Sequence, residues 1–223
     1  MAQGKLVVIE SGTDGSGKST QFELLYKRLK EEGHHVFQVK FPDYTSDSSA
    51  LVKMYLRGDF GEDPRDINLY AASAFYAVDR FASYQMKWKN HYEKGAIILA
   101  DRYTTSNMIH QASKIDNEKE RKEYLKWLWD LEFKKFQLPE PDLVIFLDVP
   151  PVYSIEIIKS RGKQDIHERD FDYLYSTYNN ALEIAGLYKW CIINCEEKGR
   201  FKSIEMIHQE IYKKVSRTLK GGD

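Results

Sequence analysis

The chain has 223 residues, a length that fits one α/β domain with insertions. Its 33 Lys and Arg residues nearly balance its 34 Asp and Glu residues, and the formal net charge of −1 gives no long-range field that would draw the protein to nucleic acid or an anionic membrane. No apolar run reaches the roughly 18–20 residues of a spanning helix, and no charged-then-apolar leader is apparent, so we expect a globular cytoplasmic protein without a nucleic-acid or membrane partner.

Short apolar runs alternate with helical stretches along the chain, which predicts βαβ units and a mainly parallel sheet. Five runs lack polar alternation, as strands covered on both faces should: residues 6–10, 36–40, 96–101, 143–148 and 191–194. We expect helices over residues 19–32, 67–91, 117–136, 151–160 and 203–219. The predicted fold class is α/β, in a single domain over residues 1–223.

One segment breaks this alternation. Residues 161–172 read RGKQDIHERDFD, with charges of both signs and little apolar content. The residue types alone fit either a solvated loop or a flap, at about residues 160–172, that presents cations to a ligand.

The first predicted strand is followed by a complete phosphate-binding motif. Residues 12–19 read GTDGSGKS and fit G-x-x-x-x-G-K-[ST] between a predicted strand and a predicted helix. The glycines let backbone N–H groups surround phosphate oxygens, and the helix N-terminus adds partial positive charge. Lys18 is expected to reach the β- and γ-phosphates, and the Ser19 hydroxyl to bind Mg²⁺. The motif predicts a site for a nucleoside triphosphate with magnesium.

A second site must decide what the protein does with the triphosphate. The guanine-reading string Asn-Lys-x-Asp of switch GTPases is absent. Asp101 and Arg102 end the third predicted strand, where a carboxylate can orient Mg²⁺ and a guanidinium can bind an acceptor phosphate. An Asp–Arg structural pair fits these two residues equally well. Tyr76 and Arg80 share one helix face and suit a base-plus-phosphate ligand, although this spacing is also typical of a core face.

Taken together, these motifs resemble those of the thymidylate kinases (dTMP kinases), a family of P-loop nucleoside monophosphate kinases. The features that carry the resemblance follow the family's order over nearly the whole chain: residues 12–20 with Asp14 in the loop, Phe41-Pro42, the string YAVDR at 76–80, DRYTTSN at 101–107, LPEPD at 138–142, Leu147-Asp148 and the segment 161–169. The resemblance implies a three-layer fold with helices around a five-stranded parallel sheet. It also implies a homodimer that phosphorylates dTMP to dTDP with ATP and Mg²⁺.

The resemblance further implies roles for individual residues. Asp14 would face the acceptor's 3′-hydroxyl, and the segment 161–169 would be a lid over ATP. ATP is expected to contact Gly12, Thr13, Asp14, Gly15, Ser16, Gly17, Lys18, Ser19 and Thr20, and Mg²⁺ to contact Ser19 and Asp101. The acceptor is expected to contact Phe41, Tyr76, Arg80, Arg102, Ser106 and Asn107, with Tyr76 stacked on the base. Catalysis is expected to depend on Lys18, Asp14, Arg102, Arg161 and Arg169.

Two departures from the family's motifs affect the phosphate-binding loop. Gly15 follows the loop aspartate where some relatives have an arginine, so the cation on the transferring phosphoryl group would come from the lid, with Arg161, Lys163 and Arg169 as candidates. Ser11 stands where the family commonly has a glutamate, which here lies one place earlier.

Two further departures affect the acceptor side. Tyr44, beside Asp43, stands where several relatives have an arginine, so acceptor-phosphate binding would depend more on Arg102 and Lys40. His110 stands where many bacterial relatives have a tyrosine that discriminates against a ribose 2′-hydroxyl.

Rival functions stay open at this level. A deoxynucleoside kinase would need a carboxylate base near the 5′-hydroxyl, for which Asp43 is the nearest candidate, and another nucleoside monophosphate could replace dTMP. A nucleotide-binding module without phosphotransfer would not need Lys18, Ser19 and Asp101 together with a basic lid. For a monophosphate acceptor, which is already an anionic nucleophile, we expect catalysis by positioning and charge neutralisation.

Overall fold

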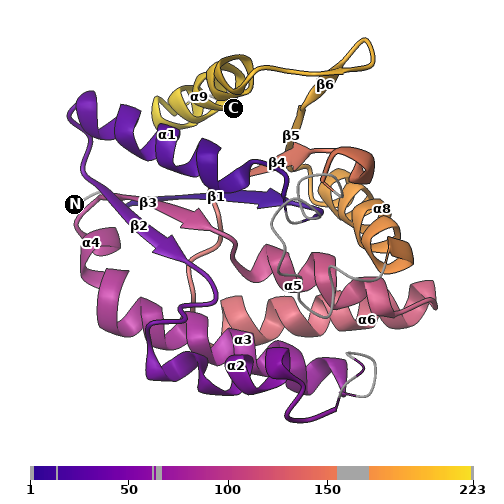
Figure 1. The fold of residues 1–223 in the computed structure, drawn as a ribbon. Helices are drawn as coiled ribbons and strands as arrows, with labels where there is room; N and C mark the ends of the chain where they lie inside the picture. The colour runs from indigo at the N-terminus through magenta and orange to yellow at the C-terminus, as the bar shows by residue number, and fades with distance from the viewer. Residues whose placement is uncertain (1–2, 14, 62, 64–66, 155–170, 222–223) are drawn as a thin grey trace.

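The computed structural model describes residues 3–13, 15–61, 63, 67–154 and 171–221. Its main sheet has five parallel strands in the order β2-β3-β1-β4-β5, with helices on both faces (Figure 1). The strands are β1 (Lys5–Ser11), β2 (Val36–Lys40), β3 (Ile97–Asp101), β4 (Leu143–Asp148) and β5 (Cys191–Asn194). The predicted α/β class and five-stranded parallel sheet are confirmed, and each strand lies within one residue of its predicted bounds.

The carboxyl ends of the parallel strands share one edge of the sheet. Ile9 of β1 aligns with Asp101 of β3, and Ser11 aligns with Leu147 of β4. The loop after β1 and the residues after Asp101 therefore meet at this edge, where open α/β sheets bind their ligands.

Helices from distant parts of the chain cover the two faces of the sheet. On one face, α1 (Lys18–Glu31) and α9 (Ile204–Leu219) pack Phe22 and Ile211 against a core that includes Ile9. On the other face, α3 (Leu69–Ser83), the π-helix η2 (Tyr84–Trp88) and α4 (Lys89–Glu93) follow one another, and Trp88 packs in a core with Val8. Because both faces are covered, the strands are continuous apolar runs rather than alternating ones.

A third packing unit lies beside the carboxyl edge. Here α5 (Thr104–His110), α6 (Glu118–Trp129) and α8 (Phe171–Leu187) share an apolar cluster that includes Met108, Tyr124 and Ile184. The π-helix η4 (Asp130–Lys135) continues α6. The remaining elements are η1 (Asp47–Ser49), α2 (Ala50–Arg57), η3 (Ala112–Lys114) and an antiparallel hairpin of β6 (Glu196–Glu197) and β7 (Arg200–Phe201).

The predicted helices agree with the structure except at their interruptions. Helix α1 begins and ends one residue before its prediction, and α9 begins one residue after. The predicted helix over 67–91 is divided by η2, and that over 117–136 changes to a π-helix at η4. Of the helix predicted over 151–160, residues 151–154 are helical and the others lie outside the described residues. The sequence analysis missed α2, α5, α8 and the hairpin.

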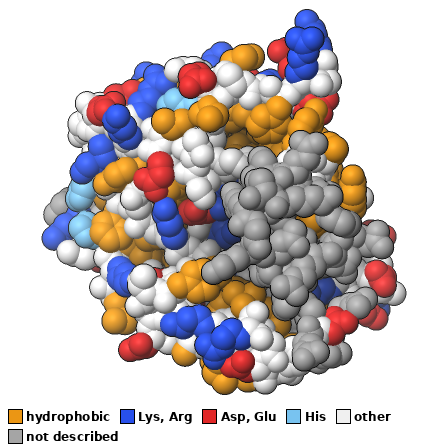
Figure 2. All heavy atoms as spheres, viewed as in Figure 1, with side chains coloured by type: hydrophobic (Ala, Val, Ile, Leu, Met, Phe, Trp, Pro, Cys, Tyr) orange, Lys and Arg blue, Asp and Glu red, His pale blue; other side chains and the backbone are white. Residues whose placement is uncertain are grey.

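The surface has the mixed charge expected from the composition. On the face seen in Figure 2, acidic and basic side chains are interspersed among apolar ones. In the part of the chain that the structure describes, no helix combines the length and apolar character that crossing a bilayer requires.

Candidate active site

The phosphate-binding loop leads from β1 into α1 and is held in place by its neighbours. A side chain at Gly12 would bring its Cβ within 3.2 Å of the Cα of Tyr178 on α8, so this position needs a residue without one. Gly17 has a φ of 77°, in the left-handed region that glycine adopts without strain. The Thr13 hydroxyl lies 3.0 Å from that of Ser154, after β4. These contacts tie the described residues of the loop to α8 and to the segment after β4. Asp14 lies outside the described residues.

Lys18 and Asp101 meet at the carboxyl edge of the sheet. The Lys18 Nζ contacts the Asp101 carboxylate, and both residues are 8% exposed. Burial lowers the pKa of Lys18, as does the charge of Arg102, while Asp101 opposes this shift. Ser19 and Thr20 are exposed on the first turn of α1. The fold thus joins the lysine and the carboxylate that the sequence assigned to ATP and Mg²⁺, and Ser19 follows Lys18 at the start of the same helix.

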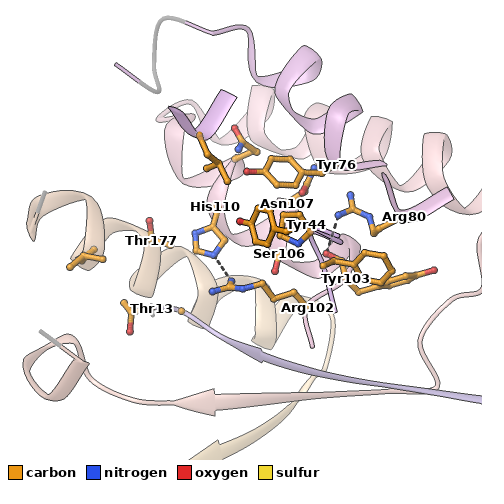
Figure 3. A pocket seen from close by; sticks show the side chains of 16 residues that line it. Thr13, Tyr44, Tyr76, Arg80, Arg102, Tyr103, Ser106, Asn107, His110 and Thr177 are labelled. Carbon is orange, nitrogen blue, oxygen red and sulfur yellow. Dashed lines mark hydrogen bonds between the residues drawn. The ribbon is translucent and has the colours of Figure 1, made fainter. Parts of the chain in front are cut away.

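A pocket opens beside this loop and contains all six residues predicted to contact the acceptor (Figure 3). Phe41 comes from the end of β2, Tyr76 and Arg80 from α3, Arg102 from the end of β3, and Ser106 and Asn107 from α5. Gly12 and Thr13 of the phosphate-binding loop line the same pocket. A ligand bound there would have one end against the phosphate-binding loop and the other against α3 and α5.

Arg80 is held by a bidentate ion pair. Its Nε and Nη2 donate to the two carboxylate oxygens of Glu132 over 2.7 and 2.5 Å, and Nη1 donates to the Tyr103 carbonyl over 3.4 Å. Both side chains are almost fully buried. Burial opposes the charge of Arg80, but Glu132 outweighs it and raises the pKa of Arg80. Glu132 thus holds the Arg80 guanidinium in one orientation at the pocket wall, a role that the sequence analysis missed.

A second buried glutamate shapes the turn between β3 and α5. Glu10 Oε1 accepts hydrogen bonds from the Tyr103 backbone N–H (3.2 Å), the Thr105 hydroxyl (2.6 Å) and the Ser106 hydroxyl (2.8 Å). Its Oε2 is buried and has no hydrogen-bond partner among the described residues. Arg102, at this turn, has a φ of 67°, a left-handed conformation that is uncommon for a residue with a side chain. The turn directs the Arg102 side chain into the pocket (Figure 3).

The base-side end of the pocket is lined by α3 and α5. The Tyr76 ring meets Tyr55 edge to face, with 6.3 Å between ring centroids. The Asn107 amide donates to the Ser73 carbonyl over 3.2 Å. Gln111, 3% exposed, also lines the pocket, and its Oε1 has no hydrogen-bond partner among the described residues. This end therefore combines an aromatic side chain with amide groups, which suits a nucleobase.

Two residues considered for the acceptor side are used elsewhere. Lys40 Nζ lies 2.8 Å from the Glu23 carboxylate, and the Lys40 side chain is half exposed and outside the pocket lining. The Asp43 carboxylate contacts Lys87 and accepts a hydrogen bond from the Thr45 hydroxyl over 2.8 Å. Burial alone would raise the pKa of Asp43, but Lys87 and Thr45 lower it. The suggestion that Lys40 binds the acceptor phosphate is thus not supported.

Several pocket residues were absent from the predicted acceptor set. They are Pro42, Tyr44, Leu56, Tyr103, His110, Gln111, Leu174 and Thr177. Of these, Leu174 and Thr177 belong to α8, a helix that the sequence analysis did not predict. Gln111 could have been found from the sequence, since it directly follows His110, a position already considered for the acceptor side. The proposed lid cations Arg161, Lys163 and Arg169 lie outside the described residues.

The donor set suits magnesium. Mg²⁺ prefers oxygen ligands and is usually bound by one or two carboxylates, a hydroxyl and substrate phosphates. Ser19 and Asp101 offer such oxygens beside the phosphate-binding loop. Within the described ranges, no cluster of three or more His, Cys, Asp or Glu side chains could hold a metal ion by itself. The residues present therefore fit a metal that is shared with bound phosphates.

A phosphate-binding loop that opens directly onto a pocket with two guanidinium groups defines a P-loop kinase for a small phosphorylated acceptor. The family model for thymidylate kinase matches residues 9–211. The chain therefore belongs to the thymidylate kinase family, and the identification made from its motifs is confirmed.

Relatives and a solved structure agree with this membership. A probable thymidylate kinase of Pyrococcus abyssi is 30% identical over 220 residues, covering 98% of this chain and 99% of that protein. A thymidylate kinase of Caldicellulosiruptor saccharolyticus is 28% identical over 219 residues, covering 98% of each. The thymidylate kinase of Candida albicans has the same fold, with a TM-score of 0.73 at 24% identity over 97% of this chain and 92% of that one.

Proposed function

We propose that the protein is a dTMP kinase that transfers the γ-phosphoryl group of ATP to the 5′-phosphate of dTMP, giving dTDP and ADP. The observation that carries this proposal is the continuity of one pocket from Gly12 and Thr13 to Tyr76 and Asn107. A monophosphate fits it with its phosphate towards the loop and its base towards α3 and α5. Membership in the thymidylate kinase family supports thymine as that base.

On the donor side, Lys18 binds the phosphates of ATP. Its burial beside Asp101 supports this role, because a cation in a water-poor site acts strongly on developing charge. Ser19 and Asp101 hold Mg²⁺, which when bound adds positive charge to the phosphate oxygens. Residues 12–20 together form the ATP-phosphate site, and Asp14 faces the acceptor sugar.

On the acceptor side, Arg102 binds the monophosphate of dTMP. Arg102 enters the pocket one residue after Asp101, and its charge already acts on Lys18. The acceptor phosphate is thereby brought near the donor phosphates, with its negative charge neutralised from both sides. Such positioning supplies much of the rate enhancement in phosphoryl transfer.

No general base is assigned, because a phosphate oxygen of dTMP is itself the nucleophile. Asp43, the candidate base of a deoxynucleoside kinase, is paired with Lys87 and does not line the pocket. This observation favours a nucleoside monophosphate over a nucleoside as the acceptor. The remaining cation for the transferring group is assigned to the lid, to Arg161, Lys163 or Arg169.

We further propose that the enzyme is a cytoplasmic homodimer. Helix α3 and the following π-helix expose Val78, Phe81 and Met86, and the Phe81 ring packs on Phe136 with 5.3 Å between centroids. Exposed apolar side chains on adjacent turns are typical of a subunit interface. Two free thiols, Cys191 and Cys195, are compatible with a reducing compartment. Sedimentation equilibrium of the wild type and of Met86→Glu tests the dimer.

The activity is tested by ADP release with each of dTMP, dUMP, UMP, CMP, AMP and thymidine in separate reactions. The proposal predicts the highest kcat/KM for dTMP and no turnover without Mg²⁺. Lys18→Ala is the matched control, since its loss of turnover excludes a contaminating kinase. A higher kcat/KM for CMP, AMP or thymidine than for dTMP contradicts the proposed acceptor.

A further inference from the structure

Two basic side chains face each other inside the acceptor pocket. Nη1 of Arg102 lies 3.0 Å from Nε2 of His110, the last residue of α5 (Figure 3). Arg102 leaves the end of β3, so this contact joins the strand edge to the far end of the helix that follows it. Both side chains line the pocket.

The chemistry of the pair assigns its protons. A guanidinium stays protonated in proteins and can only donate hydrogen bonds. His110 Nε2 must therefore be the acceptor in this contact, which requires a neutral imidazole with its proton on Nδ1. If His110 takes a second proton, Nε2 becomes a donor and the hydrogen bond is lost.

The backbone of Arg102 fixes only the direction in which its side chain leaves the strand. Its left-handed φ of 67° carries a steric cost, and its backbone N–H donates to the Ile9 carbonyl over 3.2 Å. These constraints fix where the side chain starts. The contact with His110 lies at the other end, at the guanidinium that the proposed function assigns to the acceptor phosphate.

We propose that His110 is a positioning residue for phosphoryl transfer: its neutral imidazole accepts from Arg102 and holds the guanidinium in place for the acceptor phosphate, and protonation of His110 withdraws that support. The proposal rests on the function proposed above, in which Arg102 binds the monophosphate. Acceptor binding would then be sensitive to acid in this protein. A variant with a residue at position 110 that cannot be protonated would not have this sensitivity.

The charges around the pair oppose a protonated His110. Arg102 from the end of β3, Arg80 from α3 and Lys18 from α1 are all cations in or next to the pocket. Of the nearby carboxylates, Asp101 contacts Lys18 and Glu132 pairs with Arg80, while Glu10 accepts hydrogen bonds at the turn that carries Arg102.

The other packed elements carry charges that are engaged elsewhere. Lys114 of η3 donates to the Tyr55 hydroxyl and lies near Asp63, and Asp79 of α3 accepts a hydrogen bond from the Ser48 hydroxyl. Helix α8 contributes Thr177 and Leu174 to the pocket, while the loop after β2 and α3 contribute the neutral phenols of Tyr44 and Tyr76. An imidazolium at His110 would lie beside a guanidinium from which it can no longer accept a hydrogen bond. We therefore expect acceptor binding through Arg102 to weaken once the pH is low enough to protonate His110.

The test is the pH dependence of kcat and KM for dTMP, from pH 8 to pH 5.5, in the wild type and two variants. His110→Gln retains an acceptor oxygen but cannot titrate, and His110→Phe has no acceptor at any pH. A phosphate monoester also takes up a proton in this range, but that effect is common to all the enzymes and cancels in their ratio.

At pH 8 we expect His110→Phe to raise the KM for dTMP by about tenfold, the cost of one hydrogen bond to a charged group, and His110→Gln to restore most of that loss. As the pH is lowered from 8 to 5.5, the wild-type kcat/KM for dTMP should fall further than that of His110→Gln, and the loss should approach that of His110→Phe as His110 becomes protonated. The KM for ATP should follow the same course in all three.

The control is His34→Gln, a change at an exposed histidine next to Glu32. Its ratio to the wild type should be constant over the whole pH range. The positioning role is overturned if kcat/KM for dTMP has the same pH dependence in the wild type and His110→Gln, or if the ratio of the wild-type value to that of His110→Gln increases at acid pH. A wild type that does not phosphorylate dTMP at any pH instead contradicts the proposed function, so the two failures are distinct. Thermal unfolding of His110→Phe shows whether this variant has a folding defect. If it does, the comparison of the wild type with His110→Gln alone tests the positioning role.

Discussion

The buried ion pair between Arg80 and Glu132 gives the sharpest energetic prediction. Glu132 is fully buried and accepts three hydrogen bonds, two from Arg80 at 2.7 and 2.5 Å and one from the Thr104 hydroxyl at 2.7 Å. Replacing it by alanine leaves the Arg80 guanidinium charged and unpaired in the interior. Removing one partner of a buried ion pair costs about 3–5 kcal/mol, and the lost Thr104 contact adds about 1 kcal/mol.

We therefore expect Glu132→Ala to lower the free energy of unfolding by about 4–6 kcal/mol, a large part of the roughly 5–15 kcal/mol of a typical domain. The KM for dTMP should also rise, because the pocket wall loses the group that orients Arg80. Urea unfolding followed by circular dichroism measures the first effect, and steady-state kinetics measure the second.

The matched control is Glu183→Ala, which removes a half-exposed carboxylate paired with Arg121 at 3.2 Å. An exposed pair of this kind is worth at most about 1 kcal/mol. If Glu132→Ala lowers the free energy of unfolding by no more than Glu183→Ala does, the ion pair does not stabilise the pocket wall and the reasoning is wrong.

Four further predictions follow from the site. Lys18→Ala should reduce kcat by several orders of magnitude while circular dichroism remains that of the wild type, and near-normal turnover would refute the role of the loop. Arg102→Ala should raise the KM for dTMP by about 30-fold or more but leave the Kd for ATP within a few-fold of the wild type. An equal increase in the KM for dTMP and the Kd for ATP would contradict the assignment of Arg102 to the acceptor phosphate. Alanine at each of positions 161, 163 and 169 should reveal at least one variant with kcat reduced by about 10³-fold at saturating substrates, and three near-normal values would exclude the lid as the source of the cation. Burial lowers the pKa of Lys114 to about 8, against the opposing charge of Asp63, so above pH 8 the unfolded chain binds a proton that the folded chain does not. Between pH 8 and pH 9.5 the free energy of unfolding of the wild type should therefore rise by about 1–2 kcal/mol relative to that of Lys114→Met. Equal pH dependence of the free energy of unfolding in the two proteins would contradict this.

Much of the fold could be predicted because its signals are local. The strands are continuous apolar runs, and the glycines of residues 12–17 together with Lys18 mark the strand–loop–helix junction without any tertiary information. The acceptor residues were found through strings that lie at the ends of β2 and β3 and on α3 and α5, so the parallel topology brought them together at one edge of the sheet.

What the sequence did not predict depends on contacts between distant residues. Helix α8 was missed because polar residues interrupt its apolar stripe: Thr177 and Asn180 are buried, and the Asn180 amide is satisfied by the carbonyls of Met108 and Ile109 at 3.2 and 2.6 Å. Helix α5 is only seven residues long and begins with Thr, Thr, Ser and Asn, which are weak helix formers.

The partners of charged residues were equally invisible. Arg80 and Glu132 are 52 positions apart, and Asp43 and Lys87 are 44 apart, so no helical or strand periodicity relates them. Only the folded chain shows that Glu132 orients Arg80 and that Asp43 is not available as a base.

The most direct test of the central claim is a competition in one reaction. Equimolar dTMP, dUMP, CMP, AMP and thymidine, each carrying its own isotope label, are incubated with limiting enzyme, unlabelled ATP and Mg²⁺, and the labelled phosphorylated products are separated and quantified at low conversion. Because the initial product ratio equals the ratio of kcat/KM values, a single measurement ranks all acceptors. The account predicts that dTDP is the main product and that thymidine is not phosphorylated. A main product of CDP, of ADP that carries the label of AMP, or of dTMP that carries the label of thymidine would contradict it.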